Sequence, residues 1–276
     1  QNPLANNATF YKIQFINNNT GYICGNDANV TGFCLKTTDV GNTWYVTDYD
    51  VADLFRSLSF INENTGYILG KWDHTIRKTT NGGMTWINYA IIYYPGHYYY
   101  ADINFVNENT GFIMGDVNNY NLIRTTNGGS NWTTLNTGTF NVIWKTQYIG
   151  YNTIFAVGEL GEFLKSYDMG NTWNEQQISP YYFFRSLYFA NINSGYICGN
   201  GRIYKTTDNG NNWTEQNIPR HPSSFSDLEF IDLNKGYAVG DSNCVIKTSD
   251  GGVNWNVMHF GNNVIYNDIS LQSFDS

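Results

Sequence analysis

The chain is poor in charge, in proline and in cysteine. Of its 276 residues 14% are charged, with 15 Lys and Arg against 23 Asp and Glu, and it has only 5 Pro and 4 Cys. This small, acidic charge argues against nucleic-acid binding, which requires a basic patch. No stretch approaches the roughly 20 apolar residues of a membrane-spanning helix, so a transmembrane segment is excluded. The aromatic content of 17% excludes a disordered chain, because so many rings can form a large core.

The residues that are abundant favour strands and turns. The chain is rich in Asn, Thr and Ser, with 22 Tyr and 27 Gly, a composition typical of β-structure. One pattern, Ser/Thr-x-Asp/Asn-x-Gly-x-Thr/Asn-Trp, recurs six times, with successive Trp residues 42, 46, 41, 40 and 42 residues apart. That period indicates four-stranded propeller blades. The copies end at Trp44, Trp86, Trp132, Trp173, Trp213 and Trp255.

The repeat predicts a single all-β propeller over residues 1–276. Units at 10–53, 54–98, 99–141, 142–182, 183–223 and 224–265 each contain four short strands. Residues 1–9 resemble a fourth strand and residues 266–276 a first strand, so we expect them to share an incomplete closing blade. The prediction is therefore seven blades, with six as the alternative. Because residues 1–7 have no signal-peptide pattern, we expect either that one was removed or that the chain is part of a longer protein.

The recurring turn resembles that of BNR/Asp-box propellers. The longer phrase over residues 60–86, F-I-N-E-N-T-G-Y-I-L-G followed by I-R-K-T-T-N-G-G-M-T-W, is similar to the photosystem II assembly/stability-factor-like propeller family. This resemblance implies a seven-bladed, non-catalytic, exported propeller that holds a partner. It also implies an extracellular, cell-surface or periplasmic location, as in secreted members from Bacteroidetes-type bacteria.

The Asp boxes themselves are interpreted as structural, because a turn-stabilising motif explains their presence in every unit. Their predicted structural residues are Asp39, Trp44, Asn81, Trp86, Asn127, Trp132, Asp168, Trp173, Asp208, Trp213, Asp250 and Trp255. A sialidase needs three converging arginines, whereas only Arg56 and Arg185 occupy equivalent first-strand positions. Asp102, Asp227 and Asp268 recur nearby, alternating with Lys12 and Lys145. They leave an Asp-box glycoside hydrolase open as an alternative.

The cysteines and histidines suggest no metal site. The four histidines are spread over several repeats without ligand spacing, and we expect no cofactor. In the fifth unit Asn200-Gly201 predicts a two-residue hairpin, which pairs Cys198 with Ile203. Transferred to the first unit, this register places Cys24 opposite Cys34. We therefore predict a Cys24–Cys34 disulfide, with two buried thiols as the alternative.

The loops are the best pointer to binding, because they are where the units differ. The connections between units and those between second and third strands should share one face, and several carry aromatic residues. The candidate partner-binding residues are Trp72, His74, Tyr94, His97, Tyr98, Tyr99, Tyr120, Tyr181, Tyr182 and His221. Such a weakly charged aromatic surface is typical of contacts with protein or carbohydrate. We expect a non-catalytic protein-binding or scaffold module with a protein or glycan partner; a spacer module of a surface adhesin is a further alternative.

Overall fold

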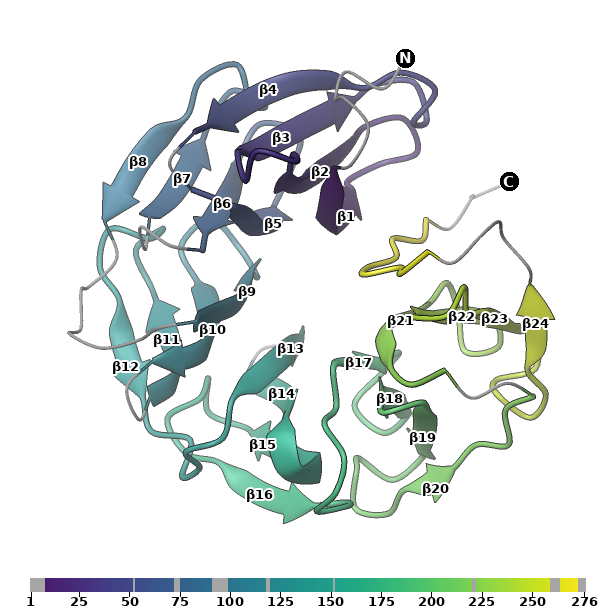
Figure 1. Ribbon diagram of the computed structural model, residues 1–276. Coiled ribbons are helices and arrows are strands. Elements are labelled where there is room, and N and C mark those ends of the chain that lie inside the picture. Colours follow the sequence, from purple (N-terminus) through teal and green to yellow (C-terminus); the bar gives the residue numbers. More distant parts are fainter. Residues whose placement is uncertain are drawn as a thin grey trace. The chain divides into compact units, whose positions relative to one another are not determined.

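A computed structural model describes residues 8–51, 53–71, 75–90, 99–117, 120–150, 152–219, 222–258 and 264–272. The chain divides into two compact units, Gln1–Leu135 and Asn136–Ser276. Each unit contains three antiparallel four-stranded sheets, which we call blades 1–3 and 4–6. Within every blade the four strands lie side by side in chain order (Figure 1). Apart from one short 3-10 helix, η1 (Glu159–Gly161), the regular structure of the described residues is β-strand.

The strands of the first unit follow the predicted repeat. Blade 1 comprises β1 (Thr9–Phe15), β2 (Gly21–Asn26), β3 (Gly32–Thr37) and β4 (Tyr45–Asp50). Blade 2 comprises β5 (Phe55–Phe60), β6 (Gly66–Gly70), β7 (Thr75–Thr79) and β8 (Ile87–Ala90). Blade 3 comprises β9 (Tyr99–Phe105), β10 (Gly111–Val117), β11 (Tyr120–Thr125) and β12 (Thr133–Leu135).

The second unit repeats the same order. Blade 4 comprises β13 (Ile143–Ile149), β14 (Thr153–Gly158), β15 (Glu162–Ser166) and β16 (Asn174–Gln177). Blade 5 comprises β17 (Ser186–Phe189), β18 (Gly195–Gly199), β19 (Arg202–Thr206) and β20 (Thr214–Glu215). Blade 6 comprises β21 (Phe225–Phe230), β22 (Gly236–Gly240), β23 (Val245–Thr248) and β24 (Asn256–Met258).

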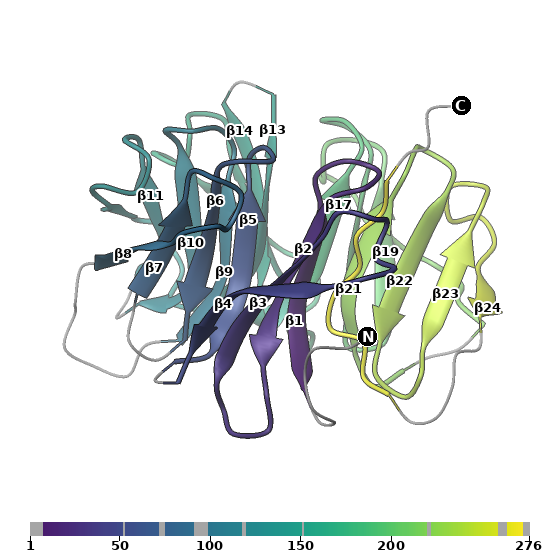
Figure 2. The same ribbon diagram turned by 90° about the horizontal axis from the view of Figure 1, so that it is seen from above.

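Because each sheet is a simple meander, its connections gather at two ends, as blade 6 shows in Figure 2. The turn end carries the Asp box and the connection between the first two strands. The loop end carries the connection between the second and third strands and the chain that leads to the next blade. The predicted hairpin at Asn200-Gly201 is confirmed at the loop end of blade 5. Its residues have φ values of 42° and 68°, and Cys198 pairs with Ile203.

The core lies between neighbouring blades and is built from the repeated aromatic positions. Tyr22 of blade 1 stacks on Phe60 of blade 2, with ring centroids 3.5 Å apart, and Phe60 packs edge-on against Trp86 of its own Asp box. Tyr196, Phe230 and Trp255 repeat the arrangement between blades 5 and 6. Such aromatic pairs stabilise a fold beyond the apolar area they bury.

The prediction of seven blades is wrong: the described residues form six four-stranded sheets. The reason lies in residues 264–272, which run beside β21 without forming a strand. Side-chain carboxylates bind this segment, since the Ile269 N–H donates to Asp227 Oδ2 at 3.2 Å and the Leu271 N–H to Glu229 Oε2 at 2.7 Å. No seventh sheet is present among the described residues, so the segment is an extension of blade 6.

Candidate functional site

The Asp boxes form closed hydrogen-bonded turns. In the first, Thr37 Oγ1 donates to Asp39 Oδ1 at 2.8 Å and accepts from the Gly41 N–H, while the Thr43 N–H donates to Asp39 Oδ1. Asn81 and Asn127 accept the same backbone and hydroxyl bonds in blades 2 and 3. The donated bonds hold the pKa values of Asp39, Asp168, Asp208 and Asp250 below the usual range. These side chains are engaged in holding the turn.

The recurring first-strand acids lie buried at contacts between blades. Asp102 accepts a hydrogen bond from Ser57 of blade 2, and Asp227 accepts one from Ser186 of blade 5. Lys145 Nζ lies 3.6 Å from Asp227 Oδ1. Asp268 belongs to the segment that runs beside β21. Because Asp102 and Asp227 are only 7% and 5% exposed, they are placed to join blades rather than to meet a substrate.

The two first-strand arginines cover aromatic rings of the preceding blade. The Arg56 guanidinium lies 4.8 Å from the ring centroid of Tyr11, and that of Arg185 lies 4.2 Å from Trp144. Tyr11 and Trp144 both sit where the pairing of the first two strands shifts register. Each arginine therefore belongs to an equivalent cation–π contact within its own unit.

The register predicted for Cys24 and Cys34 is confirmed, but the predicted disulfide is wrong. The two residues face each other across β2 and β3, and both are fully buried. All four cysteines lie in the described part of the chain, and no disulfide joins any of them. Burial raises the pKa of the Cys34 thiol to about 12, so this side chain is a protonated, apolar group of the core.

Most of the predicted binding residues lie outside the described residues; these are Trp72, His74, Tyr94, His97, Tyr98 and His221. Tyr99 begins β9 and Tyr120 begins β11, and the description of both stops at the backbone. Tyr181 and Tyr182 are described and lie at the loop end between blades 4 and 5. Tyr181 is 84% exposed, whereas Tyr182 packs against the core cluster of these two blades.

Three backbone segments meet at this loop end and form what we call the blade-4 loop surface. They are residues 139–142, the turn 158–162 and the connection 177–184. The Glu159 N–H donates to the Val142 carbonyl at 3.0 Å, and the Ile178 N–H donates to the Gly161 carbonyl at 2.8 Å. A Cβ on Gly161, whose φ is +70°, would lie 1.8 Å from the Ser179 carbonyl oxygen. Only glycine allows this close approach.

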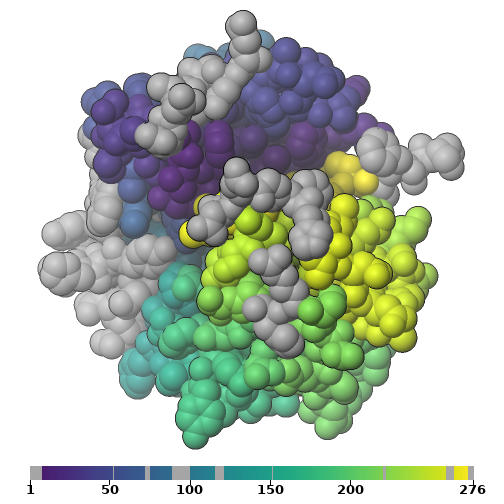
Figure 3. Space-filling view, turned by 45° about the vertical axis from the view of Figure 1, so that its right-hand side comes forward, coloured from purple at the N-terminus to yellow at the C-terminus, as the bar shows by residue number. Residues whose placement is uncertain are grey.

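Four apolar side chains project from these bonded segments into solvent. Tyr181 is the most exposed, followed by Phe140 at 79%, with Leu160 at 41% and Phe183 at 40%. The Phe183 N–H donates to Asn200 Oδ1 at 2.7 Å, which ties the connection to the hairpin of blade 5. Figure 3 shows one face of this unit, coloured from teal through green to yellow.

The buried carboxyl of Glu162 holds part of the blade-4 loop surface in place. Glu162 is 3% exposed, and its Oε1 accepts hydrogen bonds from Thr139 Oγ1, at 2.8 Å, and from Asn141 Nδ2. Its Oε2 is buried without a hydrogen-bond partner, and burial raises the pKa of the carboxyl. Since Thr139 and Asn141 flank Phe140, this contact fixes the backbone that presents the exposed ring.

A charged edge borders the aromatic residues. The Arg202 guanidinium lies 5.2 Å from the ring centroid of Tyr182 and forms an ion pair with Glu215. Arg202 follows the Asn200-Gly201 hairpin, so the same turn positions both the amide that binds Phe183 and the cation that covers Tyr182. The arrangement is an apolar patch with a polar rim, as in protein-binding surfaces.

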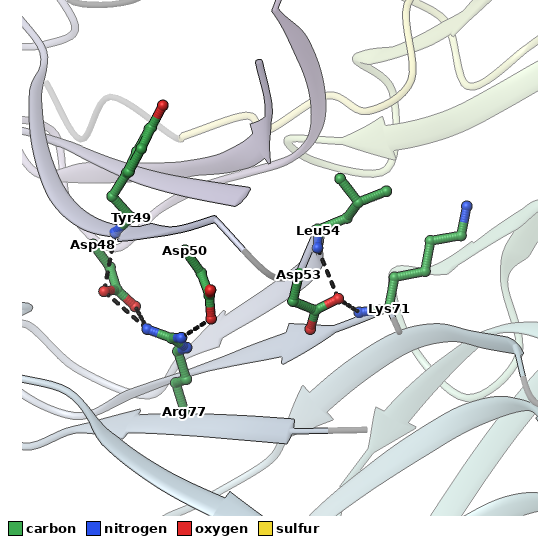
Figure 4. A network of polar contacts seen from close by, with 7 residues as sticks. All are labelled: Asp48, Tyr49, Asp50, Asp53, Leu54, Lys71 and Arg77. Atoms are coloured by element: carbon green, nitrogen blue, oxygen red, sulfur yellow. Dashed lines mark hydrogen bonds and ion pairs between the residues drawn. The ribbon is translucent and has the colours of Figure 1, made fainter. Parts of the chain in front are cut away.

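A separate polar network joins blades 1 and 2 in the first unit (Figure 4). Arg77 of β7 donates to both carboxylate oxygens of Asp48, at 3.1 and 2.8 Å, and also contacts Asp50 of β4. Asp53 Oδ1 accepts from the backbone N–H groups of Leu54 and Lys71, at 2.7 and 3.0 Å. Burial raises the pKa of Asp48, and Arg77 offsets only part of that rise. These groups pair with one another and so serve the contact between blades.

The described residues have neither a metal-binding cluster nor a membrane-spanning helix. They contain no cluster of three His, Cys, Asp or Glu side chains suited to a metal ion. None of the described segments forms a helix long and apolar enough to span a membrane.

Residues 35–140 match the model of a protein family described as photosynthesis system II assembly factor YCF48. A solved structure of YCF48 bound to D1 peptide aligns with a TM-score of 0.72 and 22% identity, over 92% of this chain and 83% of that chain. YCF48 from Cyanidioschyzon merolae aligns with a TM-score of 0.71 and 19% identity, over 93% and 86%. The chain resembles photosystem II assembly-factor propellers of the BNR type.

Enzymes share this fold as well. The GH74 xyloglucanase from Xanthomonas campestris aligns with a TM-score of 0.73 and 11% identity, over 92% of this chain and 46% of that chain. No curated protein sequence matches the chain significantly. At these identities the structural likenesses define the fold, and the function has to be argued from the residues themselves.

Sequence reasoning singled out Tyr181 and Tyr182 but missed Phe140, Leu160 and Phe183 as parts of one surface. A usable signal was present. Phe140 stands between turn-forming residues, and Leu160 occupies a turn position at which blade 5 has Asn200. An apolar side chain at a turn has no core to enter, and Leu160 even adopts a φ of 52°, which is unusual for a residue other than glycine.

Proposed function

We propose that the chain is a non-catalytic propeller that binds a protein partner through the blade-4 loop surface. The observation that carries the proposal is the projection of Phe140, Leu160, Tyr181 and Phe183 from three backbone segments that are bonded to one another. Large apolar side chains held on a rigid base lose little conformational entropy on binding, so they are effective anchors. YCF48 bound to D1 peptide supports the proposal, because it is an example of this fold holding a polypeptide.

A site-specific photo-crosslinker tests the binding surface. We would introduce it in place of Tyr181 and, as a matched control, in place of Tyr167, which is 43% exposed and belongs to the Asp-box turn of the same blade. We expect a discrete adduct from position 181 alone, and its loss when Phe140→Ser and Phe183→Ser are added. Equal adducts from both positions, or an adduct indifferent to the two serine substitutions, would contradict this choice of surface.

The non-catalytic part of the proposal rests on the recurring acids. Asp102 and Asp227 are buried and bound by serine hydroxyls, whereas a glycosidase needs a pair of carboxyl groups that flank the substrate. Incubation with xyloglucan and with aryl glycosides should therefore give no turnover. Hydrolysis that disappears in Asp227→Asn would establish the enzymatic alternative instead.

We also propose that the protein acts outside the cytoplasm, which the resemblance to exported propellers supports. Fractionation of the native host should recover the protein in the periplasmic, cell-surface or extracellular fraction. Recovery with a cytoplasmic marker enzyme would exclude this location without affecting the binding proposal.

A further inference from the structure

Contacts between successive blades repeat an arrangement that we call the Lys–Tyr clamp. A Tyr of the second strand and a Lys of the third pair across the strands, and both donate to one backbone carbonyl in the Asp-box turn of the next blade. Tyr196 and Lys205 of blade 5 bind the Gly251 carbonyl in this way, at 2.7 and 2.6 Å. Tyr22 with Lys36 binds Gly82, and Tyr67 with Lys78 binds Gly128, at 3.0–3.3 Å.

Blade 4 makes the lysine contact of the clamp without a tyrosine. Phe155 stands where blades 1, 2, 5 and 6 have Tyr, opposite Lys165 in the strand pairing. Lys165 still donates to the equivalent carbonyl, that of Asn209, at 3.1 Å. The lysine therefore makes the contact between blades even where the tyrosine hydroxyl is missing.

Blade 6 has both residues of the clamp, but neither of them binds a backbone carbonyl in the described part of the chain. Tyr237 and Lys247 pair across β22 and β23 (Figure 1), and Lys247 Nζ lies 5.4 Å from the tyrosine ring centroid, close to the 5.1–5.4 Å of the occupied clamps. Neither side chain makes a hydrogen bond or an ion pair with another described residue. Both donors are therefore present, and no carbonyl of the described residues accepts from them.

The position beside β21, on the side away from β22, is occupied by residues 264–272. The Leu271 N–H donates to Glu229, and Glu229 is the cross-strand partner of Tyr237. Residues 264–272 thus lie where the first strand of a following blade would lie, and none of the described residues forms an Asp-box turn that accepts from Tyr237 or Lys247. A ligand for this clamp has to supply a tight turn with an outward carbonyl.

Blade 1 presents such a carbonyl. Val40 is the fourth residue of its Asp box, the position that Gly82, Gly128, Asn209 and Gly251 occupy in the turns that receive a clamp. Val40 is 54% exposed, with a φ of 63°. Its carbonyl accepts no hydrogen bond from the described residues. The chain therefore carries a donor clamp on blade 6 and a matching acceptor turn on blade 1.

We propose that the clamp of Tyr237 and Lys247 binds the Val40 turn of a second copy of the chain. The contact is heterologous, because donor and acceptor lie on different blades, so each copy has both halves and association can continue beyond a pair. A lysine ammonium bound to a carbonyl is a charge-assisted hydrogen bond, stronger than a neutral one. The proposal is independent of the blade-4 loop surface.

Sedimentation velocity over a range of concentrations tests the contact. We expect reversible self-association of the wild-type chain, weakened about tenfold or more by Lys247→Ala. Tyr237→Phe should weaken it less, because it reproduces blade 4. Lys235→Ala is the matched control, since it removes one exposed lysine from the same blade without touching the clamp.

A zero-length carboxyl-to-amine crosslink then identifies the two halves. A mixture of isotope-labelled and unlabelled chains should give a Lys247–Asp39 crosslink between the two isotopic forms, which Lys247→Ala abolishes. A chain that stays monomeric at every concentration, or self-association unchanged by Lys247→Ala, would overturn the proposal. A Lys247–Asp39 crosslink confined to single isotopic forms would overturn it too, since the contact would then lie within one chain.

Discussion

Ser186 Oγ donates a 2.5 Å hydrogen bond to Asp227 Oδ1 across the contact between blades 5 and 6. Both residues are buried. Asp227 also accepts a hydrogen bond from the Ile269 N–H and forms an ion pair with Lys145. One carboxylate thus joins blade 4, blade 5, blade 6 and the segment that follows blade 6. Ser57 and Asp102 form the equivalent bond between blades 2 and 3.

Replacing Ser186 should lower the free energy of unfolding without changing the fold. Ser186→Ala removes one donor from a buried carboxylate, which costs about 1–3 kcal/mol of unfolding free energy. Urea unfolding followed by tryptophan fluorescence measures the change. Ser223→Ala, at an exposed serine just before β21 of blade 6, is the control and should be nearly neutral. Equal stability of the two variants would show that the bond contributes nothing to the contact between blades.

The Asp-box carboxylates should make the protein sensitive to acid. The hydrogen bonds of the turn lower the pKa values of Asp39, Asp168, Asp208 and Asp250. A lowered folded-state pKa contributes stability that is present above the unfolded value, near 3.9, and is lost as the pH falls through the folded value. Urea midpoints measured from pH 6 down to pH 2.5 should fall accordingly.

The chain supplies its own control for this dependence, because blades 2 and 3 have Asn81 and Asn127 at the same position. Asp168→Asn should keep the turn and reduce the loss of stability between pH 5 and pH 2.5. A variant with an unchanged pH profile would mean that these exposed carboxylates do not contribute to acid unfolding.

Unlike the Asp-box carboxylates, Glu162 should lower the stability of the fold as the pH rises. Burial raises the pKa of its carboxyl, so its ionisation destabilises the fold as the pH rises from the unfolded value, near 4.3, through the folded one. Glu162→Gln cannot ionise and keeps an oxygen that can accept from Thr139. The unfolding free energy of this variant relative to wild type should therefore increase between pH 4 and pH 7. A difference that does not depend on pH would contradict the assignment.

The cysteines should be unreactive in the folded protein. Cys34 has a pKa raised to about 12 and Cys198 one well above its usual value, in both cases because burial disfavours the thiolate that reacts. Ellman's reagent at pH 8 should therefore label none of the four native thiols within minutes. The same protein in guanidinium without reductant should titrate as four thiols, and a count of two would show that one disulfide is present after all.

The parts of the fold that depend on local pattern could be predicted from the sequence. Each Asp box contains its own turn bonds, as Thr37, Asp39 and Thr43 show, so eight residues suffice to define it. The two-residue hairpin at Asn200-Gly201 sets the pairing of β18 with β19, and the repeat carries that register to Cys24 and Cys34.

Only the part of the blade-4 loop surface that lies within one loop could be predicted from the sequence, because prediction depends on local pattern. Tyr181 was found because aromatic residues cluster in its loop, but nothing local joins Phe140 to Leu160. The segments that carry them are joined by the bond between Glu159 and Val142 and by Glu162, which accepts from Thr139 and Asn141. These contacts connect residues about 20 positions apart, so only the folded chain reveals them.

By itself, the sequence determined the strand order, the blade length and the turn chemistry, because each follows from hydrogen bonds or apolar alternation within one repeat. The tertiary structure decided how many blades form, which buried groups pair and which side chains reach solvent. Asn267–Leu271 has the pattern of a first strand, yet Asp227 and Glu229 bind its backbone and it joins no sheet. Cys24 and Cys34 face each other and are fully buried, yet they remain unbridged. In both cases the outcome depends on neighbours that the repeat pattern does not specify.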